Sequence, residues 1–169
     1  TAYDPYADKD RLLSMGIESV PLMDLMSSSD YVCIMARVTP ETKKMVGLPE
    51  LGAMKQDAVF INTARAALVD TDALLKVLEE GGIRAAIEVY DKEPISRDNP
   101  FLKLDPSRVL LLPHFAGNSV ERITFHSKAA VDNIMDFLHG KKTGHIFDPS
   151  VFESSAFPSH GGELFGSMH

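Results

Sequence analysis

The sequence predicts an α/β protein built on a parallel sheet. Four short runs, at residues 31–35, 58–61, 83–90 and 109–112, are rich in apolar side chains at successive positions and do not alternate with polar ones. Amphipathic or polar segments separate these runs. Strands that are apolar on both faces and alternate with helices are typical of a parallel sheet packed on each side by helices.

Local signals place the first helices. Residues 8–14 form a short helical pattern before Gly16, and apolar positions recur at helical spacing over residues 22–26. Thr39-Pro40-Glu41 combines an N-cap residue, a proline at the first helical position and an acid in the first turn. This combination predicts that another helix begins there.

Two later helices have clear ends. Asp70 precedes an amphipathic stretch that ends at Gly81, which suits an N-cap and a C-terminal glycine. Asn118 and Glu121 resemble a capping box at the start of the longest helix, whose apolar period continues to Gly140.

Composition excludes several classes of protein. The chain has 169 residues, 44% of them hydrophobic, with 17 basic against 24 acidic residues and a net charge of −7. This balance argues against a disordered chain and against non-specific binding of nucleic acid. Cys33 is the only cysteine, which excludes an internal disulfide and a cysteine-built metal site. We therefore expect a cytoplasmic protein without a resident metal, with Cys33 buried in a strand. No apolar run reaches the roughly 18 residues that a membrane helix needs.

Polar side chains follow each expected strand. Asp4 comes after the strand stub at the N-terminus, and Arg37, Arg65, Glu93 and His114 each follow a later strand. The carboxyl ends of parallel strands meet at one edge, where ligands of open α/β sheets bind. We therefore expect these side chains to surround one site.

Three of these residues have complementary chemistry. His114 can give and take a proton near neutral pH, and a carboxylate such as Glu93 beside it favours the protonated ring. The guanidinium of Arg65 can pair with a carboxylate through two hydrogen bonds. Together they suit a small anionic substrate with a polarisable oxygen.

The motifs around these residues resemble those of the D-isomer-specific 2-hydroxyacid dehydrogenases, which include phosphoglycerate dehydrogenase-like and glyoxylate reductase-like enzymes. The resemblance extends in order from residue 1 to about residue 150. It rests on the segments Tyr3-Asp4-Pro5-Tyr6, Val38-Thr39-Pro40-Glu41-Thr42, Asn62-Thr63-Ala64-Arg65, Glu93-Pro94 and Leu112-Pro113-His114-Phe115-Ala116-Gly117.

The resemblance implies hydride transfer between a nicotinamide cofactor and C2 of a small 2-hydroxy or 2-oxo acid. Arg65 would bind the substrate carboxylate, His114 would exchange the hydroxyl proton and Glu93 would orient His114. Asp4 would bind the adenosine ribose and repel a 2′-phosphate, which favours NAD over NADP. The other cofactor contacts implied are Ala36, Arg37, Thr42, Thr63, Ala64, Arg65, Glu88, His114 and Gly117. The family also implies a homodimer.

The implied fold is a Rossmann-type doubly wound sheet over residues 1–140, but without its first strand and Gly-x-Gly-x-x-Gly turn. We therefore expect the chain to be a fragment, with residues 141–169 forming a tail that returns toward a substrate domain. Arg37, Ala66 and Glu88 also replace the proline, glycine and aspartate usual in the family.

The sequence is also compatible with two other functions. Relatives of these dehydrogenases that sense NAD and bind partner proteins would carry the same cofactor domain. Alternatively, Thr1 could be an N-terminal nucleophile whose own amine acts as the base.

Overall fold

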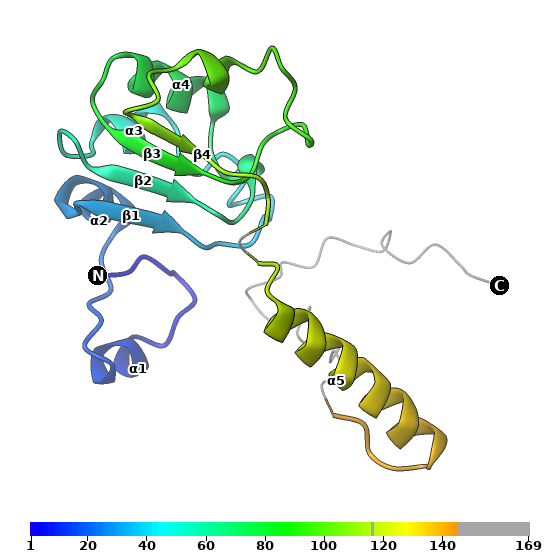
Figure 1. Cartoon of the computed structure of the whole chain (residues 1–169). Coiled ribbons are helices and arrows are strands. Elements are labelled where there is room, and N and C mark those ends of the chain that lie inside the picture. The colour runs from blue at the N-terminus through cyan, green and yellow to red at the C-terminus, as the bar shows by residue number, and fades with distance from the viewer. Residues whose placement is uncertain (116, 145–169) are drawn as a thin grey trace. The chain divides into compact units, whose positions relative to one another are not determined.

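The computed structural model describes residues 1–115 and 117–144. It contains a four-stranded parallel sheet in the order β1-β2-β3-β4, which confirms the α/β class (Figure 1). The strands are β1 (Tyr31–Ile34), β2 (Val59–Asn62), β3 (Arg84–Ile87) and β4 (Val109–Leu111). The described residues fall into two compact units that meet in sequence between Asn118 and Ser119.

The register of the sheet aligns the ends of all four strands. Ile34 pairs with Asn62, Asn62 with Ile87, and Ile87 with Leu111. The residues that follow these four positions therefore leave the sheet at the same edge, as the sequence predicts.

Five α-helices and two short 3₁₀ helices occur in the described residues. They are α1 (Lys9–Ser14), α2 (Leu22–Ser28), α3 (Leu48–Gly52), α4 (Thr71–Glu79), α5 (Val120–Leu138), η1 (Ala66–Leu68) and η2 (Pro100–Lys103).

The core lies on one face of the sheet, with Phe60 of β2 at its centre. Phe60 is completely buried and shares the core with Met26 of α2, Leu51 of α3 and Leu74 of α4. Burying a side chain of this size contributes about 1.5–3 kcal/mol to stability. These contacts hold the helices against the strands and so fix the loops at the carboxyl edge.

The opposite face of the sheet is open in the unit Thr1–Asn118, which corrects the expectation for Cys33. Cys33 is exposed, and its neighbour on the same face of β1, Tyr31, is 73% exposed. Leu110 of β4 is 57% exposed. Side chains alternate between the two faces along a strand. In β1 the described residues of this unit bury Val32 and Ile34 on one face and leave the other face exposed.

The helix expected at Thr39 does not form. The Thr39 hydroxyl oxygen accepts a hydrogen bond from the Thr42 N–H at 3.2 Å, but residues 40–44 form only a turn. Lys44 ends this turn with a φ of 55°, and α3 begins after Gly47 instead. A threonine followed by a proline and an acid suits the start of a turn as well as that of a helix.

The other helix signals agree with the structure, although α2 extends two residues beyond the predicted 22–26. Asp70 caps α4 by accepting from the Ala73 N–H at 3.2 Å, and Gly81 beyond the helix has a φ of 73°. For α5 the N-cap is Ser119 and not Asn118, because its hydroxyl oxygen accepts from the Arg122 N–H at 3.1 Å.

The N-terminal residues pair with a segment outside the four-stranded sheet. Ala2 and Ser19 form an isolated parallel bridge, in which the Ala2 N–H donates to the Glu18 carbonyl at 2.8 Å and the Ala2 carbonyl accepts from the Val20 N–H at 2.9 Å. Ala2 therefore has strand-like pairing, at the place where the sequence predicts the end of a strand. Within the described residues, β1 pairs with β2 alone.

The second unit extends from Ser119 to His169, and its described part is α5 and the residues after it as far as Gly144. Apolar side chains on α5, among them Ile123, Ile134 and Leu138, are exposed. Residues 145–169, which make up most of the predicted tail, lie outside the described residues. Among the described helices, none is both long and apolar enough to cross a membrane.

Candidate active site

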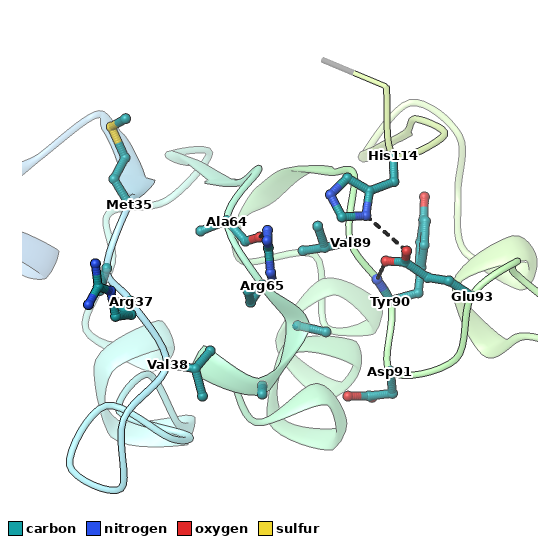
Figure 2. A pocket seen from close by; sticks show the side chains of 13 residues that line it. Met35, Arg37, Val38, Ala64, Arg65, Val89, Tyr90, Asp91, Glu93 and His114 are labelled. Atoms are coloured by element: carbon teal, nitrogen blue, oxygen red, sulfur yellow. Dashed lines mark hydrogen bonds and ion pairs between the residues drawn. The ribbon is translucent and has the colours of Figure 1, made fainter. Parts of the chain in front are cut away.

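A cavity of about 830 Å³ lies at the carboxyl edge of the sheet (Figure 2). Its walls come from the segments that follow β1, β2, β3 and β4. Six of the predicted site residues line it, namely Ala36, Arg37, Ala64, Arg65, Glu93 and His114. Seven residues to which the sequence assigned no contact complete the wall, namely Met35, Val38, Ala66, Ala67, Val89, Tyr90 and Asp91.

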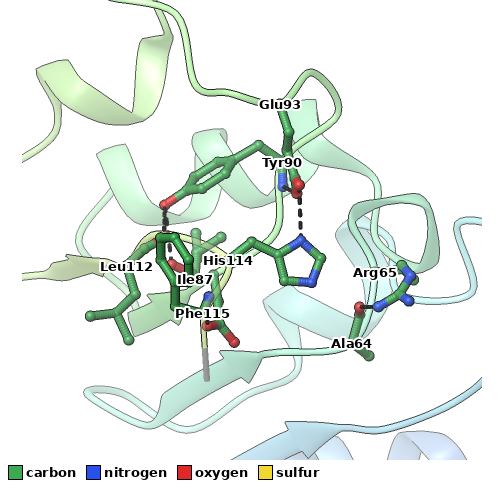
Figure 3. A network of polar contacts seen from close by, with 9 residues as sticks. Ala64, Arg65, Ile87, Tyr90, Glu93, Leu112, His114 and Phe115 are labelled. Atoms are coloured by element: carbon green, nitrogen blue, oxygen red, sulfur yellow. Dashed lines mark hydrogen bonds and ion pairs between the residues drawn. The ribbon is translucent and has the colours of Figure 1, made fainter. Parts of the chain in front are cut away.

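His114 and Glu93 form a pair in this cavity (Figure 3). The Nδ1 atom of His114 lies 2.9 Å from Oε2 of Glu93, and the other carboxylate oxygen accepts from the Tyr90 N–H at 3.0 Å. These two hydrogen bonds, that from His114 foremost, lower the pKa of the Glu93 carboxyl, and the charge of Arg65 acts in the same direction. Glu93 is therefore held in its ionised form against the ring.

Arg65 is presented by a tight turn at the end of β2. The buried Asn62 amide donates to the Arg65 carbonyl and accepts from the Ala64 N–H, each at 3.1 Å. The guanidinium of Arg65 donates through Nη1 to the Ala64 carbonyl at 2.6 Å and remains exposed. Other guanidinium N–H groups can face an anion.

Sequence reasoning did not assign a role to Asn62. The available signal is a polar residue directly after the apolar run of residues 58–61. A buried side-chain amide whose donor and acceptor both bind the backbone of the residues that follow it fixes that backbone.

Glu88 is buried but does not line the cavity. It is 2% exposed, and its Oε1 accepts from the Phe115 N–H at 2.7 Å. The structure thus places Glu88 behind His114.

The remaining predicted cofactor residues also lie outside the cavity wall. Asp4 is exposed and its Oδ1 accepts from the Tyr6 N–H at 2.9 Å. Thr42 donates its hydroxyl to the Arg37 carbonyl at 2.6 Å, which shapes the loop after β1. Thr63 and Gly117 are exposed on the loops that follow β2 and β4.

The cavity suits one end of a nicotinamide cofactor together with a small acid. Four of its wall residues are alanines, which leave room, and Met35, Val38 and Val89 provide apolar surface. Arg65 offers a positive group for a carboxylate, and the His114–Glu93 pair can exchange a proton. Residues 1–115 and 117–144 contain no group of three or more His, Cys, Asp or Glu side chains that could hold a metal ion.

Comparison with known proteins identifies the family of the chain. Residues 1–116 match the D-isomer specific 2-hydroxyacid dehydrogenase, NAD binding domain. The chain belongs to this family.

Relatives of known activity or structure extend the match. A glyoxylate reductase of Korarchaeum cryptofilum is 38% identical over 150 residues, which are 88% of this chain and 45% of that protein. The apo D-mandelate dehydrogenase of Rhodotorula graminis superposes with a TM-score of 0.74 at 28% identity, over 88% of this chain and 44% of that one. The acyclic imino acid reductase Bsp5, solved with NADPH and D-Arg, gives 0.67 at 31% identity, over 78% and 42%. The chain thus spans less than half the length of these relatives.

Proposed function

We propose that this chain carries the catalytic edge of an NAD-dependent oxidoreductase that interconverts a small 2-hydroxy acid and the matching 2-oxo acid. The observation that supports this most directly is the His114–Glu93 pair at 2.9 Å in the same cavity as Arg65. The glyoxylate reductase among the relatives makes glyoxylate and related short 2-oxo acids the first substrates to test.

The side chains divide the work as follows. Arg65 binds the substrate carboxylate and draws electron density from the 2-oxygen. His114 turns Nδ1 toward Glu93, which leaves Nε2 to give a proton to that oxygen on reduction and to take it back on oxidation. Glu93 stabilises the positively charged ring and holds its orientation. When bound, the nicotinamide supplies or accepts the hydride.

The other cofactor contacts follow the carboxyl edge. We assign the adenosine ribose to Asp4, whose negative charge disfavours a 2′-phosphate and so favours NAD over NADP. The remaining proposed contacts are Arg37, Thr42, Thr63, Arg65, His114 and Gly117, together with the alanines at 36 and 64. Glu88, which the resemblance also implies as a contact, is buried and does not line the cavity.

We assign the sheet to a doubly wound Rossmann fold. The Ala2–Ser19 bridge and the β1–β2 pairing suit the two sides of such a sheet, on either side of a strand that the described residues do not include. We assign residues 1–140 to the cofactor domain and residues 141–169 to a segment running toward the substrate domain. The proposed assembly is a homodimer.

The test is NADH oxidation by the full-length polypeptide with glyoxylate, hydroxypyruvate and pyruvate. His114→Asn should lower kcat by about 100-fold or more, because it removes the proton donor. His126→Asn, on the exposed surface of α5, is the matched control and should not lower it. Unchanged turnover in His114→Asn would overturn the proposal. Tight NADH binding without turnover of any of these acids would favour the alternative function, that of a relative of these dehydrogenases that senses NAD and binds partner proteins.

A further inference from the structure

Two segments meet behind the cavity. One is the β3 loop, residues 88–93, and the other is the His114 segment, residues 112–115. Three hydrogen bonds join them. Figure 3 shows two, from Tyr90 Oη to the Leu112 carbonyl at 2.9 Å and between His114 Nδ1 and Glu93 Oε2 at 2.9 Å. The third runs from the Phe115 N–H to Glu88 Oε1 at 2.7 Å. The bonds of Leu112 and Phe115 hold the backbone on either side of His114, and the bond to Glu93 holds its ring.

Tyr90 connects both members of the catalytic pair. Its backbone N–H holds Glu93, and its hydroxyl group holds the carbonyl of Leu112, two residues before His114. The side chain is only 9% exposed, and its ring packs edge-on against Phe101 with the centroids 6.4 Å apart. Because the ring is fixed by packing, its hydroxyl is a rigid anchor and not a mobile one.

The chemistry of the Tyr90 hydroxyl suits a permanent donor. Burial raises the pKa of the phenol, so the group stays protonated at neutral pH. Both of its close neighbours are backbone carbonyls, that of Leu112 at 2.9 Å and that of Ile87 at 3.2 Å. Its position therefore links the end of β3 to the end of β4.

Glu88 holds the backbone that follows His114, because its carboxylate accepts a hydrogen bond from the Phe115 N–H. A carboxylate accepting a backbone N–H forms a charge-assisted bond, which is stronger than a neutral one. Glutamate has one methylene more than the aspartate that the family resemblance leads one to expect here. The structure uses the reach of Glu88 to bind Phe115.

We propose that Tyr90 and Glu88 are positioning residues, which hold the backbone on both sides of His114 and thereby fix its ring against Glu93. This inference rests on the proposed role of His114 as proton donor and acceptor. Two hydrogen bonds hold the backbone that flanks His114, and a third holds its ring, so the ring stays close to the geometry that proton transfer needs. A displacement of about 1 Å can cost on the order of 100-fold in rate.

Tyr90→Phe in the full-length polypeptide tests the proposal, because it removes one hydroxyl and keeps the ring. Two readouts are needed, the steady-state constants for NADH and the 2-oxo acid, and the ¹⁵N shifts of the His114 ring, assigned with His114→Asn. We expect kcat to fall about tenfold with both KM values unchanged. We also expect the fraction of neutral ring protonated on Nδ1 to decrease. Tyr31→Phe, on the open face of β1, is the matched control and should change neither readout.

Glu88→Asp is the second variant and decides the matter if Tyr90→Phe does not fold. A carboxylate shortened by one methylene should release the Phe115 N–H and change the His114 ring shifts in the same direction. If Glu88 instead serves the cofactor, this variant changes the Kd for NADH and leaves the ring shifts as they are, which would overturn its positioning role.

The outcomes separate this proposal from the one on which it rests. Folded Tyr90→Phe with unchanged ring shifts overturns the positioning role of Tyr90, whatever happens to kcat. Unchanged turnover in His114→Asn overturns the proposed function instead, and the ring shifts then still report whether Tyr90 and Glu88 hold the imidazole.

Discussion

His114 Nδ1 lies 2.9 Å from Glu93 Oε2, although 21 residues separate the two in sequence. The pairing of β3 with β4 brings them together, since each residue follows the end of one of these adjacent strands. The second oxygen of Glu93 is held by the Tyr90 N–H, so the carboxylate has one orientation toward the ring.

Glu93→Gln should lower kcat by about 10–100-fold, because the amide keeps the shape of the side chain but cannot stabilise a positively charged ring. The KM for the 2-oxo acid should change little, since Arg65 remains in place. Steady-state assays of NADH oxidation check this. Asp98→Asn, an exposed acid of the same loop region, is the control; equal losses in both variants would contradict the specific role of Glu93.

The pH dependence should follow from the lowered pKa of Glu93. A carboxyl with a lowered pKa is still ionised when the pH equals its ordinary pKa. It gains a proton only when the pH falls through the lowered pKa. The ion pair should therefore persist through the usual carboxyl range and be lost below it. In His114→Asn the largest cause of the shift is gone, and the pKa of Glu93 should rise toward 4.5, its unperturbed value. Carboxyl ¹³C titration measures this, and the same Glu93 titration in both proteins would refute it.

Asn62→Ala should disturb the turn that presents Arg65. The variant leaves the Ala64 N–H and the Arg65 carbonyl without their buried partner, which costs about 1–3 kcal/mol of stability. The KM for the 2-oxo acid should rise, because the backbone that carries the Arg65 guanidinium is no longer held in one position. Asn99→Ala removes a similar bond, to the Phe101 N–H, away from the cavity. It should cost stability without raising KM, and an equal rise in KM there would refute the prediction.

Phe60→Ala should destabilise the fold by about 3–5 kcal/mol, since this ring is fully buried at the centre of the core. Chemical denaturation of the full-length polypeptide measures the change. Leu13→Ala, at a site 70% exposed on α1, should change the free energy of unfolding by less than about 0.5 kcal/mol. A small effect at Phe60 would mean that β2 does not form the centre of the core.

Arg65→Lys should raise the KM for the 2-oxo acid by about tenfold or more. Lysine keeps the charge but loses the planar fork that pairs with a carboxylate through two bonds. Arg97→Lys, on the exposed loop after the β3 loop, should leave KM unchanged. The prediction fails if Arg65→Lys binds the acid as well as the unchanged protein does.

The sequence by itself determined the parallel α/β class, the cap at Asp70 and the set of residues at one edge of the sheet. Apolar runs and helix caps depend on a few neighbouring residues, so they can be interpreted from the sequence without knowledge of the fold. The parallel direction of the strands then required Arg65, Glu93 and His114 to leave the sheet at the same edge, and all three line the cavity there.

The tertiary structure decided what depends on residues far apart. Thr39 makes its local hydrogen bond in a turn as readily as at a helix start, and only the surrounding chain selects the turn. Cys33 has an apolar neighbourhood in sequence but lies on the open face of the sheet. The bonds of Tyr90 to Leu112 and of Glu88 to Phe115 arise from the alignment of β3 with β4. Such bonds span more than 20 residues, and no local pattern predicts which hydroxyl or carboxylate will reach which backbone group.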